Sequence, residues 1–298
     1  MILLELFSGI GGFSKGFEKA GYPISQTYFS EIDKHAIANF KYNFPHAQHI
    51  GPVEKIATAD IPPPDILTFG SPCQDFSDLG KGAGMAGRRS SLIGYAIEAV
   101  RHFRPHVFVW ENVKGALFAK HRADFFSILK ALADIGGYRL EWQLLNTNWF
   151  LPQNRERIYL VGRLAERCAG DVFPIGERHC PDGPTQRNKG ACFGTITRSY
   201  GSRPTIADYL MEVPHGQAEG LGYGLPLRPE HYKKVRMLTP VECERLQGFP
   251  DDFTRLGDYD GQMNPIPLVQ RYCLLGNAVS VPTVEAVASR IKNNTILD

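Results

Sequence analysis

Cys73 lies where α/β enzymes place reactive groups. It belongs to the stretch GSPCQDFS, residues 70–77, which directly follows the apolar run of residues 65–69. The run is typical of a buried strand, and reactive side chains of α/β proteins commonly stand in the turn after such a strand. Free cysteines are also often buried for packing alone. This segment by itself therefore leaves two interpretations open, a nucleophile and a structural cysteine.

A glycine-rich turn and a distant acid point to a bound nucleoside. The stretch LFSGIGGFSKGF, residues 6–17, follows a strand-like run and opens a helix. Its glycines let the backbone approach a ligand, and a helix N-terminus offers unpaired N–H groups. Glu31 stands 20 residues after Gly11, where dinucleotide sites place the carboxylate that holds ribose hydroxyls. NAD fits less well because Ser14 replaces the third glycine, and a turn that only packs helix on strand is the alternative.

Strand-like and helix-like runs alternate over the first 163 residues, and two of them break the rhythm. Alternation predicts a mainly parallel sheet with helices on both faces. Residues 139–162 contain two strand-like runs without a helix between them, so we expect an antiparallel pair at one sheet edge. The expected strands are 2–7, 24–30, 65–69, 106–111, 139–146 and 157–162, and the expected helices are 12–20, 33–43, 91–103 and 122–135.

Composition excludes several classes of protein. The chain has 298 residues, a net charge of +2 and 43% hydrophobic residues, which is ordinary for a globular protein. Its six cysteines form no C-x-x-C pair, so we expect neither a metal site nor a disulfide framework. No apolar run reaches the ~20 residues that span a bilayer, and the first residues lack the features of a signal peptide. We therefore expect a cytoplasmic protein without membrane segments.

The character of the sequence changes in its second half. Residues 164–235 are rich in Gly, Pro, His and Arg, and residues 183–207 contain four basic residues and no acid. This change predicts a small domain over residues 164–264, inserted into a catalytic and cofactor-binding domain of residues 1–163 plus 265–298.

Two helices are expected near the C-terminal end. Thr239 and Glu242 occupy the N-cap and N3 positions of a capping box, which predicts a helix over 239–247. Pro282 opens a last helix over 283–292, because proline is favoured in the first turn.

Four segments together resemble the DNA cytosine-5 methyltransferase family. They are the glycine turn, Pro72-Cys73-Gln74, Trp110-Glu111-Asn112-Val113 and Gln153-Asn154-Arg155-Glu156-Arg157, and they follow the family's order. The stretches RMLTPVECERLQGFP (236–250) and YCLLGNAVSVP (272–282) resemble the family's last two motifs. The resemblance implies a Rossmann-like S-adenosylmethionine-dependent methyltransferase fold with a small inserted target-recognition domain. It also implies a bacterial or phage modification enzyme that acts on a specific sequence of double-stranded DNA.

The resemblance assigns catalytic roles to four residues. Cys73 matches the nucleophile that adds to C6 of cytosine and so makes C5 reactive toward the methyl group. Glu111 matches the acid that holds N3 and the exocyclic amine. Arg155 and Arg157 match basic residues near the cytosine O2 and a phosphate, and we expect Arg155 to contact the base and Arg157 to be structural. Without the resemblance, Glu111 would suit a loop cap and the two arginines a solvated strand edge.

The resemblance also implies a set of cofactor contacts. Glu31 would hold the ribose hydroxyls and Asn277 would approach the methionine part. One departure concerns Pro52, which stands where the family often has an aspartate that contacts the adenine amine. The full set of matching positions is Phe7, Gly9, Gly11, Glu31, Ser71, Leu92 and Asn277.

The expected DNA contacts come from two stretches. The target base must be flipped out of the duplex, and residues 78–90, rich in glycine and basic residues, match the family's mobile loop over that base. A surface loop without this role is the alternative. Arginines of the small domain are candidates for reading guanine. The candidate DNA-binding residues are Gln74, Ser77, Lys81, Arg88, Arg89, Arg187, Lys189, Arg198, Tyr200 and Arg203.

Three other functions compete with DNA methylation. A tRNA cytosine-5 methyltransferase would keep the same fold, but the basic Gly/Ser-rich stretch favours DNA. A non-catalytic DNA-binding relative conflicts with the presence of Cys73, Glu111 and Arg155 together, and an NAD oxidoreductase leaves the Pro-Cys-Gln turn unexplained. We expect a monomer, and a cognate restriction endonuclease is a candidate partner. No pattern in the sequence predicts the DNA sequence that it recognises.

Overall fold

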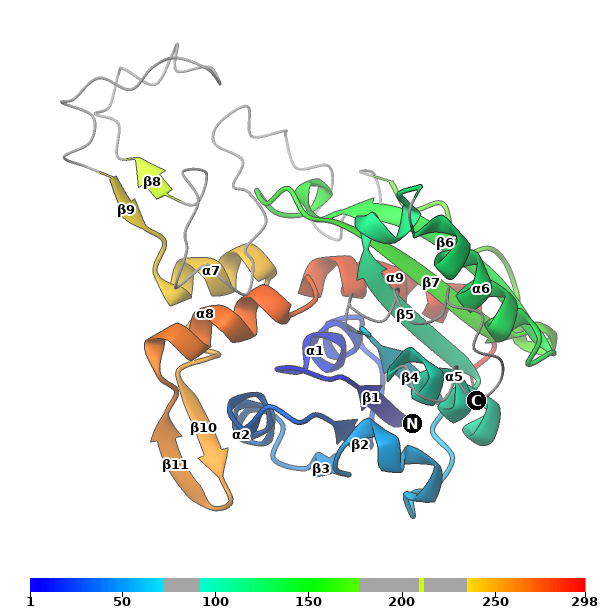
Figure 1. Ribbon diagram of the computed structural model, residues 1–298, viewed down its shortest axis with the longest axis horizontal. Helices are drawn as coiled ribbons and strands as arrows, with labels where there is room; N and C mark the ends of the chain where they lie inside the picture. The colour runs from blue at the N-terminus through cyan, green and yellow to red at the C-terminus, as the bar shows by residue number, and fades with distance from the viewer. Residues whose placement is uncertain (72–91, 120, 177–208, 212–234, 298) are drawn as a thin grey trace, which may run out of the picture.

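A seven-stranded sheet forms the centre of the computed structural model, which describes residues 1–71, 92–119, 121–176, 209–211 and 235–297 (Figure 1). The strand order is β3-β2-β1-β4-β5-β7-β6. Strands β1 to β5 are parallel, whereas β7 runs antiparallel to both β5 and β6. The antiparallel pair predicted at a sheet edge is thereby confirmed. The strands are β1 (Ile2–Leu6), β2 (Gln26–Ser30), β3 (Gln48–His49), β4 (Ile66–Phe69), β5 (Val107–Val113), β6 (Tyr138–Asn146) and β7 (Glu156–Leu164).

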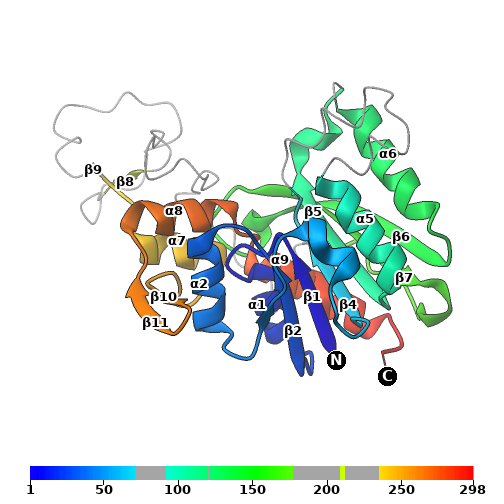
Figure 2. The ribbon, with the colours of Figure 1, turned by 60° about the horizontal axis from the view of Figure 1, so that its bottom comes forward.

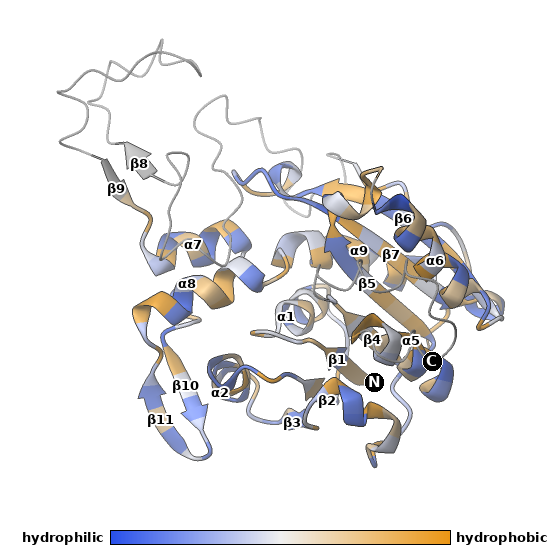
Figure 3. Ribbon diagram, in the orientation of Figure 1, coloured by the Kyte–Doolittle hydropathy of each residue, from blue (hydrophilic) through white to orange (hydrophobic). Residues whose placement is uncertain are grey.

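Helices bury both faces of this sheet. Helices α5 (Leu92–Phe103) and α6 (Arg122–Ala133) cover one face, and α1 (Gly12–Lys19) and α9 (Val281–Asn293) cover the other (Figure 2). Because successive strand residues point to opposite faces, Leu4 packs with the α5–α6 side and Leu3 with the α1–α9 side. Parallel strands that are buried on both faces need nearly continuous apolar sequence, and β5 shows it along most of its length (Figure 3).

A third apolar cluster joins the C-terminal elements to the sheet domain. Helix α2 (Lys34–Asn43) packs against a group formed by α7 (Pro240–Gln247), α8 (Leu268–Asn277) and the hairpin of β10 (Leu256–Tyr259) and β11 (Gln262–Pro265). Ile10 and Ala36 share this cluster with Leu238 and Phe253. The sequence pattern predicts neither α8 nor the hairpin, and it assigns residues 238–264 to the second domain, although they pack here on the first.

Residues 171–175 also lie on the sheet domain, held by side chains of β6. The Glu141 carboxylate accepts hydrogen bonds from the backbone N–H groups of Val172 and Phe173, at 3.0 and 3.3 Å. The Gln143 amide accepts from the N–H of Ile175 at 2.8 Å and donates to its carbonyl at 2.9 Å. These side chains satisfy the backbone of a segment that has no strand partner of its own, as buried backbone requires.

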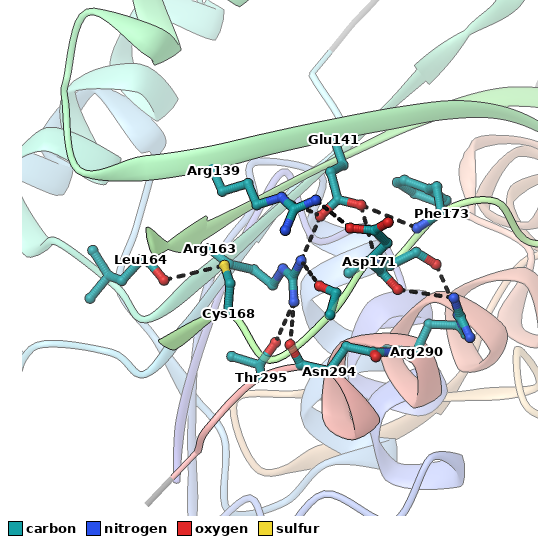
Figure 4. Close-up of polar contacts among 12 residues, drawn as sticks. Arg139, Glu141, Arg163, Leu164, Cys168, Asp171, Phe173, Arg290, Asn294 and Thr295 are labelled. Carbon is teal, nitrogen blue, oxygen red and sulfur yellow. Dashed lines mark hydrogen bonds and ion pairs between the residues drawn. The ribbon is translucent and has the colours of Figure 1, made fainter. Parts of the chain in front are cut away.

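Arg163 connects the same segment to the C-terminal chain (Figure 4). Its side chain is fully buried and donates to the Gly170 carbonyl at 2.7 Å, to Glu141 at 2.5 Å and to the Thr295 hydroxyl at 3.2 Å. Arg290 of α9 adds hydrogen bonds to two further backbone carbonyls of the segment. A buried guanidinium is tolerated because its donors have acceptors on several sides.

The smaller elements complete the described chain. Strands β8 (Tyr209–Met211) and β9 (Val235–Met237) form an antiparallel pair. The 3-10 helices are η1 (Val53–Thr58), η3 (Lys114–Leu117), η4 (Thr147–Trp149) and η5 (Ala165–Arg167). The capping box predicted at Thr239 and Glu242 is confirmed at the start of α7. Within the described residues, no helix combines the length and apolar character needed to cross a membrane.

Gly16 provides a test of the packing that seats α1 on α9. A Cβ added there would lie 2.4 Å from Cγ1 of Val284. Alanine normally favours a helix over glycine by about 1 kcal/mol, but here the clash should dominate. We expect Gly16→Ala to lower the free energy of unfolding by about 1–3 kcal/mol in urea titrations. Gly115→Ala is the control, because its nearest contact would be an ordinary 3.7 Å; equal stability of both variants would contradict the tight α1–α9 contact.

Candidate active site

The carboxyl ends of four parallel strands reach the same level of the sheet. In the observed register, Leu6 pairs with Ser30 on one side and with Phe69 on the other, and Phe69 pairs with Trp110. The chain order reverses between β1 and β4, and ligands of open α/β sheets bind at such a switch point. The glycine turn, Glu31, the chain leading to Cys73 and Glu111 therefore all begin at one edge.

The glycine turn after β1 is held open by Glu31. Phe7, Gly9 and Gly11 adopt positive φ angles of 54°, 53° and 83°. The Glu31 carboxylate accepts the N–H of Gly9 at 2.8 Å and the N–H groups of Ile32 and Asp33 at 2.7 and 3.0 Å. A Cβ on Gly9 would meet no atom within 4 Å, whereas one on Gly11 would lie 2.5 Å from the Phe44 ring. Gly9 thus leaves space beside an acid, and Gly11 serves packing on α2.

Glu5 holds the end of the glycine turn where α1 begins. Its buried carboxylate accepts the N–H and the hydroxyl of Ser14, at 3.0 and 2.5 Å. Gly11, the N-cap of α1, has no side chain to cap the helix, so Glu5 supplies an acceptor to its first turn. Burial raises the pKa of Glu5 to about 7, with a smaller contribution from the charge of Glu31. The sequence analysis missed this residue, although an acid inside an apolar strand is itself a signal.

Ser71, the last described residue before Cys73, is held by side chains of β5. The indole N–H of Trp110 donates to the Ser71 hydroxyl at 3.2 Å. The Asn112 amide donates to the carbonyl and the hydroxyl of Ser71, at 3.2 Å each. All three side chains are buried. The residue that precedes Pro72-Cys73-Gln74 in the sequence is therefore fixed to β5.

Glu111 lies beside this chain and is paired with Arg157. Its side chain is buried, and its Oε1 atom lies 3.1 Å from Nε of Arg157. A Cβ on Gly70 would lie 3.4 Å from the other carboxylate oxygen, so the backbone after β4 passes close to the acid. A buried carboxylate with one cationic neighbour, next to the exit toward Cys73, is an arrangement suited to proton transfer.

Arg155 has a different environment from Arg157. Its guanidinium is buried and donates to the carbonyl of Ala278 at 2.7 Å and to that of Gly276 at 3.4 Å. These carbonyls flank Asn277, which is exposed at the end of α8. The sequence analysis expected Arg155 at the base and Arg157 in a structural role. In the structure Arg155 holds backbone carbonyls, whereas Arg157 holds the acid and also donates to the carbonyl of Glu156 at 2.8 Å.

Other predicted cofactor residues lie around the same edge. Leu92 is the first residue of α5 and is half-buried. Pro52 follows β3 and is the N-cap of η1, so it offers no acid to an adenine. Ile32 was not predicted, yet its side chain is 78% exposed directly after Glu31. An exposed apolar residue next to a strand-end acid is a signal for a ligand surface.

Many predicted residues fall outside the described part of the chain, so the structure places none of them. They are the nucleophile Cys73 and the candidate DNA contacts Gln74, Ser77, Lys81, Arg88, Arg89, Arg187, Lys189, Arg198, Tyr200 and Arg203.

The sequence was compared with models of known protein families. The model of the family described as C-5 cytosine-specific DNA methylase matches residues 1–218 and 184–293. The chain belongs to this family. It is therefore a DNA (cytosine-5)-methyltransferase, which transfers a methyl group from S-adenosylmethionine to C5 of cytosine in DNA. The family predicted from the motifs is confirmed.

Individual relatives extend over almost the whole chain. The type II methyltransferase M.NgoBI of Neisseria gonorrhoeae is 35% identical over 303 residues, covering 95% of this chain and 90% of the relative. M.HaeII of Haemophilus aegyptius is 33% identical over 308 residues, covering 98% and 92%. In fold, the chain is similar to the Entamoeba histolytica methyltransferase EhMeth, with a TM-score of 0.68, 18% identity and 98% coverage of both chains. The Rossmann-like methyltransferase fold predicted from the sequence is thereby confirmed.

The buried carboxyl of Glu5 predicts a measurable pH dependence of stability. Because its pKa is raised from 4.5 to about 7 in the folded protein, the folded state binds the proton more tightly than the unfolded one. Stability from this group is therefore present below pH 4.5 and is lost as the pH rises through 7, by about 3 kcal/mol. We expect Glu5→Gln to remove that loss. The free energies of unfolding measured by urea titration at pH 5 and pH 8 should therefore differ less in this variant than in the wild type.

The exposed Glu18 of α1 provides the control, since it pairs with Lys15 at the surface. Glu18→Gln should retain the wild-type pH dependence. A wild-type pH dependence in Glu5→Gln as well would show that Glu5 does not carry this titration.

Proposed function

We propose that Cys73, Glu111 and Arg157 carry out methyl transfer on the target cytosine. One observation carries the proposal: the buried Glu111 carboxylate, paired with Arg157, lies against the chain that leads to Cys73. A proton donor and a cation beside the backbone that precedes the nucleophile in sequence suit a reaction in which negative charge develops on the base.

The chemistry divides among these groups as follows. The Cys73 thiolate adds to C6 of the flipped cytosine, and the electron pair of the 5,6-bond moves toward C5 and the N3–O2 part of the ring. Glu111 supplies a proton to N3, and Arg157 stabilises charge at O2. The cofactor supplies an electrophilic methyl group, which C5 takes. A solvent base then removes the C5 proton, and the electron pair of that C–H bond re-forms the 5,6-bond and expels the thiolate. N3 returns its proton to Glu111, which restores the ring.

We assign Arg155 a positioning role. Arg155 lies between β6 and β7, and its hydrogen bonds to the carbonyls of Gly276 and Ala278 hold Asn277, at the end of α8, at the edge of the site. Arg157 is instead placed to exchange its contact with Glu111 for one with the base, because an ion pair between side chains can open when a substrate arrives.

The residues at the edge of the sheet fit S-adenosylmethionine. The space at Gly9 and the Glu31 carboxylate beside it suit a ribose, whose hydroxyls can donate to the acid. We propose that Ile32 packs against the adenine, which would compensate for Pro52 in place of the family's usual acid. Asn277 and the half-buried Phe7 complete the site toward the methionine part, with Ser71 and Leu92 beside them.

We propose that target recognition is confined to residues 177–236. The packing of residues 171–175 on β6 and of residues 238–266 on α2 supports narrower limits than 164–264. Similarity to type II methyltransferases supports a cognate restriction endonuclease as a functional partner, and action on DNA supports an intracellular location. We propose that a monomer performs the reaction.

Cys73→Ser tests the nucleophile directly. We expect the wild type to transfer labelled methyl from S-adenosylmethionine to duplex DNA, at C5 within one short sequence that bisulfite sequencing identifies. The variant should lose roughly a thousandfold or more of the rate while its cofactor affinity is unchanged, because serine is a far weaker nucleophile. Transfer to tRNA but not to duplex DNA would overturn the proposed substrate of this site.

Substitution of Arg155 and substitution of Arg157 should have different effects on stability and on the rate of methyl transfer. Arg157→Ala should slow methyl transfer by about a hundredfold through loss of charge stabilisation, with the smaller loss of stability. Arg155→Ala should lower the free energy of unfolding by about 2–4 kcal/mol, since it leaves buried carbonyls without donors. Single-turnover rates and urea titrations of both variants measure this. The opposite pattern would restore Arg155 as the residue at the base.

A further inference from the structure

Tyr159 lies directly opposite Glu111 in the sheet. Strand β7 runs between β5 and β6, and Tyr159 pairs with Glu111 on one side and with Gln143 on the other. Residues directly opposite each other on neighbouring strands point to the same face. Tyr159 and Glu111 therefore both extend from the face covered by α1 and α9.

Packing explains the ring of Tyr159 but not its hydroxyl. The residue is 1% exposed, and its ring belongs to an apolar cluster with Leu145, Val172 and Ile175. Among the described residues, the hydroxyl has no hydrogen-bond partner. A buried polar atom without a partner is destabilising, so phenylalanine would serve this packing better. The hydroxyl needs another explanation.

The charges around this hydroxyl belong to the proposed catalytic group. Burial raises the pKa of Tyr159 far above its ordinary value, and the negative charge of Glu111 raises it further, whereas Arg155 and Arg157 act in the opposite direction. The hydroxyl therefore keeps its proton at any working pH. It is a permanent hydrogen-bond donor within the electrostatic reach of Glu111.

The carboxylate of Glu111 requires a hydrogen-bond donor. Its Oε1 atom is buried and accepts no hydrogen bond from the residues that the structure describes, although Nε of Arg157 lies 3.1 Å away as an ion pair. If Arg157 turns to the base, as proposed above, this oxygen loses its only described cationic neighbour. A buried carboxylate in that state requires a donor.

We infer that Tyr159 is a positioning residue for Glu111, whose hydroxyl donates a hydrogen bond to the carboxylate when the target base engages Arg157. The inference rests on the proposed role of Glu111. It explains why a hydroxyl is kept in an apolar cluster at the expense of stability, because its partner becomes available only in the loaded enzyme.

Tyr159→Phe separates this role from a structural one. We expect the free variant to be as stable as the wild type or more stable in thermal unfolding, because an unpartnered buried hydroxyl is removed. Its affinity for S-adenosylmethionine, measured by calorimetry, should stay within twofold. The single-turnover rate of methyl transfer to duplex DNA should fall about ten- to hundredfold, as expected for a lost hydrogen bond to a charged group, with little change in KM for DNA.

Tyr138→Phe is the matched control. Tyr138 is another strand tyrosine, but its hydroxyl already donates to the Pro105 carbonyl at 2.7 Å. This variant should melt at a lower temperature and methylate at the wild-type rate, which is the opposite of the pattern expected for Tyr159→Phe.

Glu111→Gln distinguishes failure of this inference from failure of the proposed site. If Glu111→Gln is slow and Tyr159→Phe methylates at the wild-type rate, the role of Tyr159 is overturned and the proposed site stands. If Glu111→Gln is itself at the wild-type rate, both fall. A slow Tyr159→Phe that is also less stable and binds the cofactor poorly would show a structural role and overturn the inference.

Discussion

The register of the parallel strands is the constraint on which the site depends. Because β1 and β4 both end at the level of Trp110 in β5, the glycine turn, the chain toward Cys73 and Glu111 are neighbours although they are far apart in sequence. A shift of β5 by one residue would turn Glu111 toward α5 and bring Trp110 to the other face. The apolar clusters on the two faces oppose such a shift, so the same packing that stabilises the sheet also sets the positions of the reacting groups.

Two arginines near the start of β7, one buried and one half-buried, illustrate how the protein separates permanent from exchangeable contacts. Arg155 donates to backbone carbonyls, which cannot move without unfolding a loop, and it therefore fixes the end of α8. Arg157 contacts a side-chain carboxylate, which can rotate. At the glycine turn both acids have backbone partners, since Glu31 accepts the N–H of Gly9 and Glu5 accepts the N–H of Ser14.

The sequence was informative where chemistry and local geometry coincide. The glycine turn, the spacing to Glu31 and the capping box at Thr239 could be predicted because each depends on a few adjacent residues. The contacts of Arg155 and Arg157 could not be predicted, because their acceptors come from distant parts of the chain, the end of α8 and β5. Helix α8 and the hairpin were missed for a related reason: their faces pack on α2, and short mixed sequences do not reveal a distant partner. The boundary at 164 was placed by composition, whereas β6 side chains hold the chain to residue 175.

The attachment of residues 171–175 to β6 has a consequence for how this family diversifies. Its hydrogen bonds come from Glu141, Gln143 and Arg290, which belong to the sheet domain, and the chain returns at Leu238 into another apolar cluster of that domain. Both ends of the intervening stretch are thus fastened independently of what lies between them. Under the proposal that this stretch recognises the target, its length and sequence can change between two fixed points without disturbing the groups proposed to react, so that a new DNA specificity requires exchange of this stretch alone.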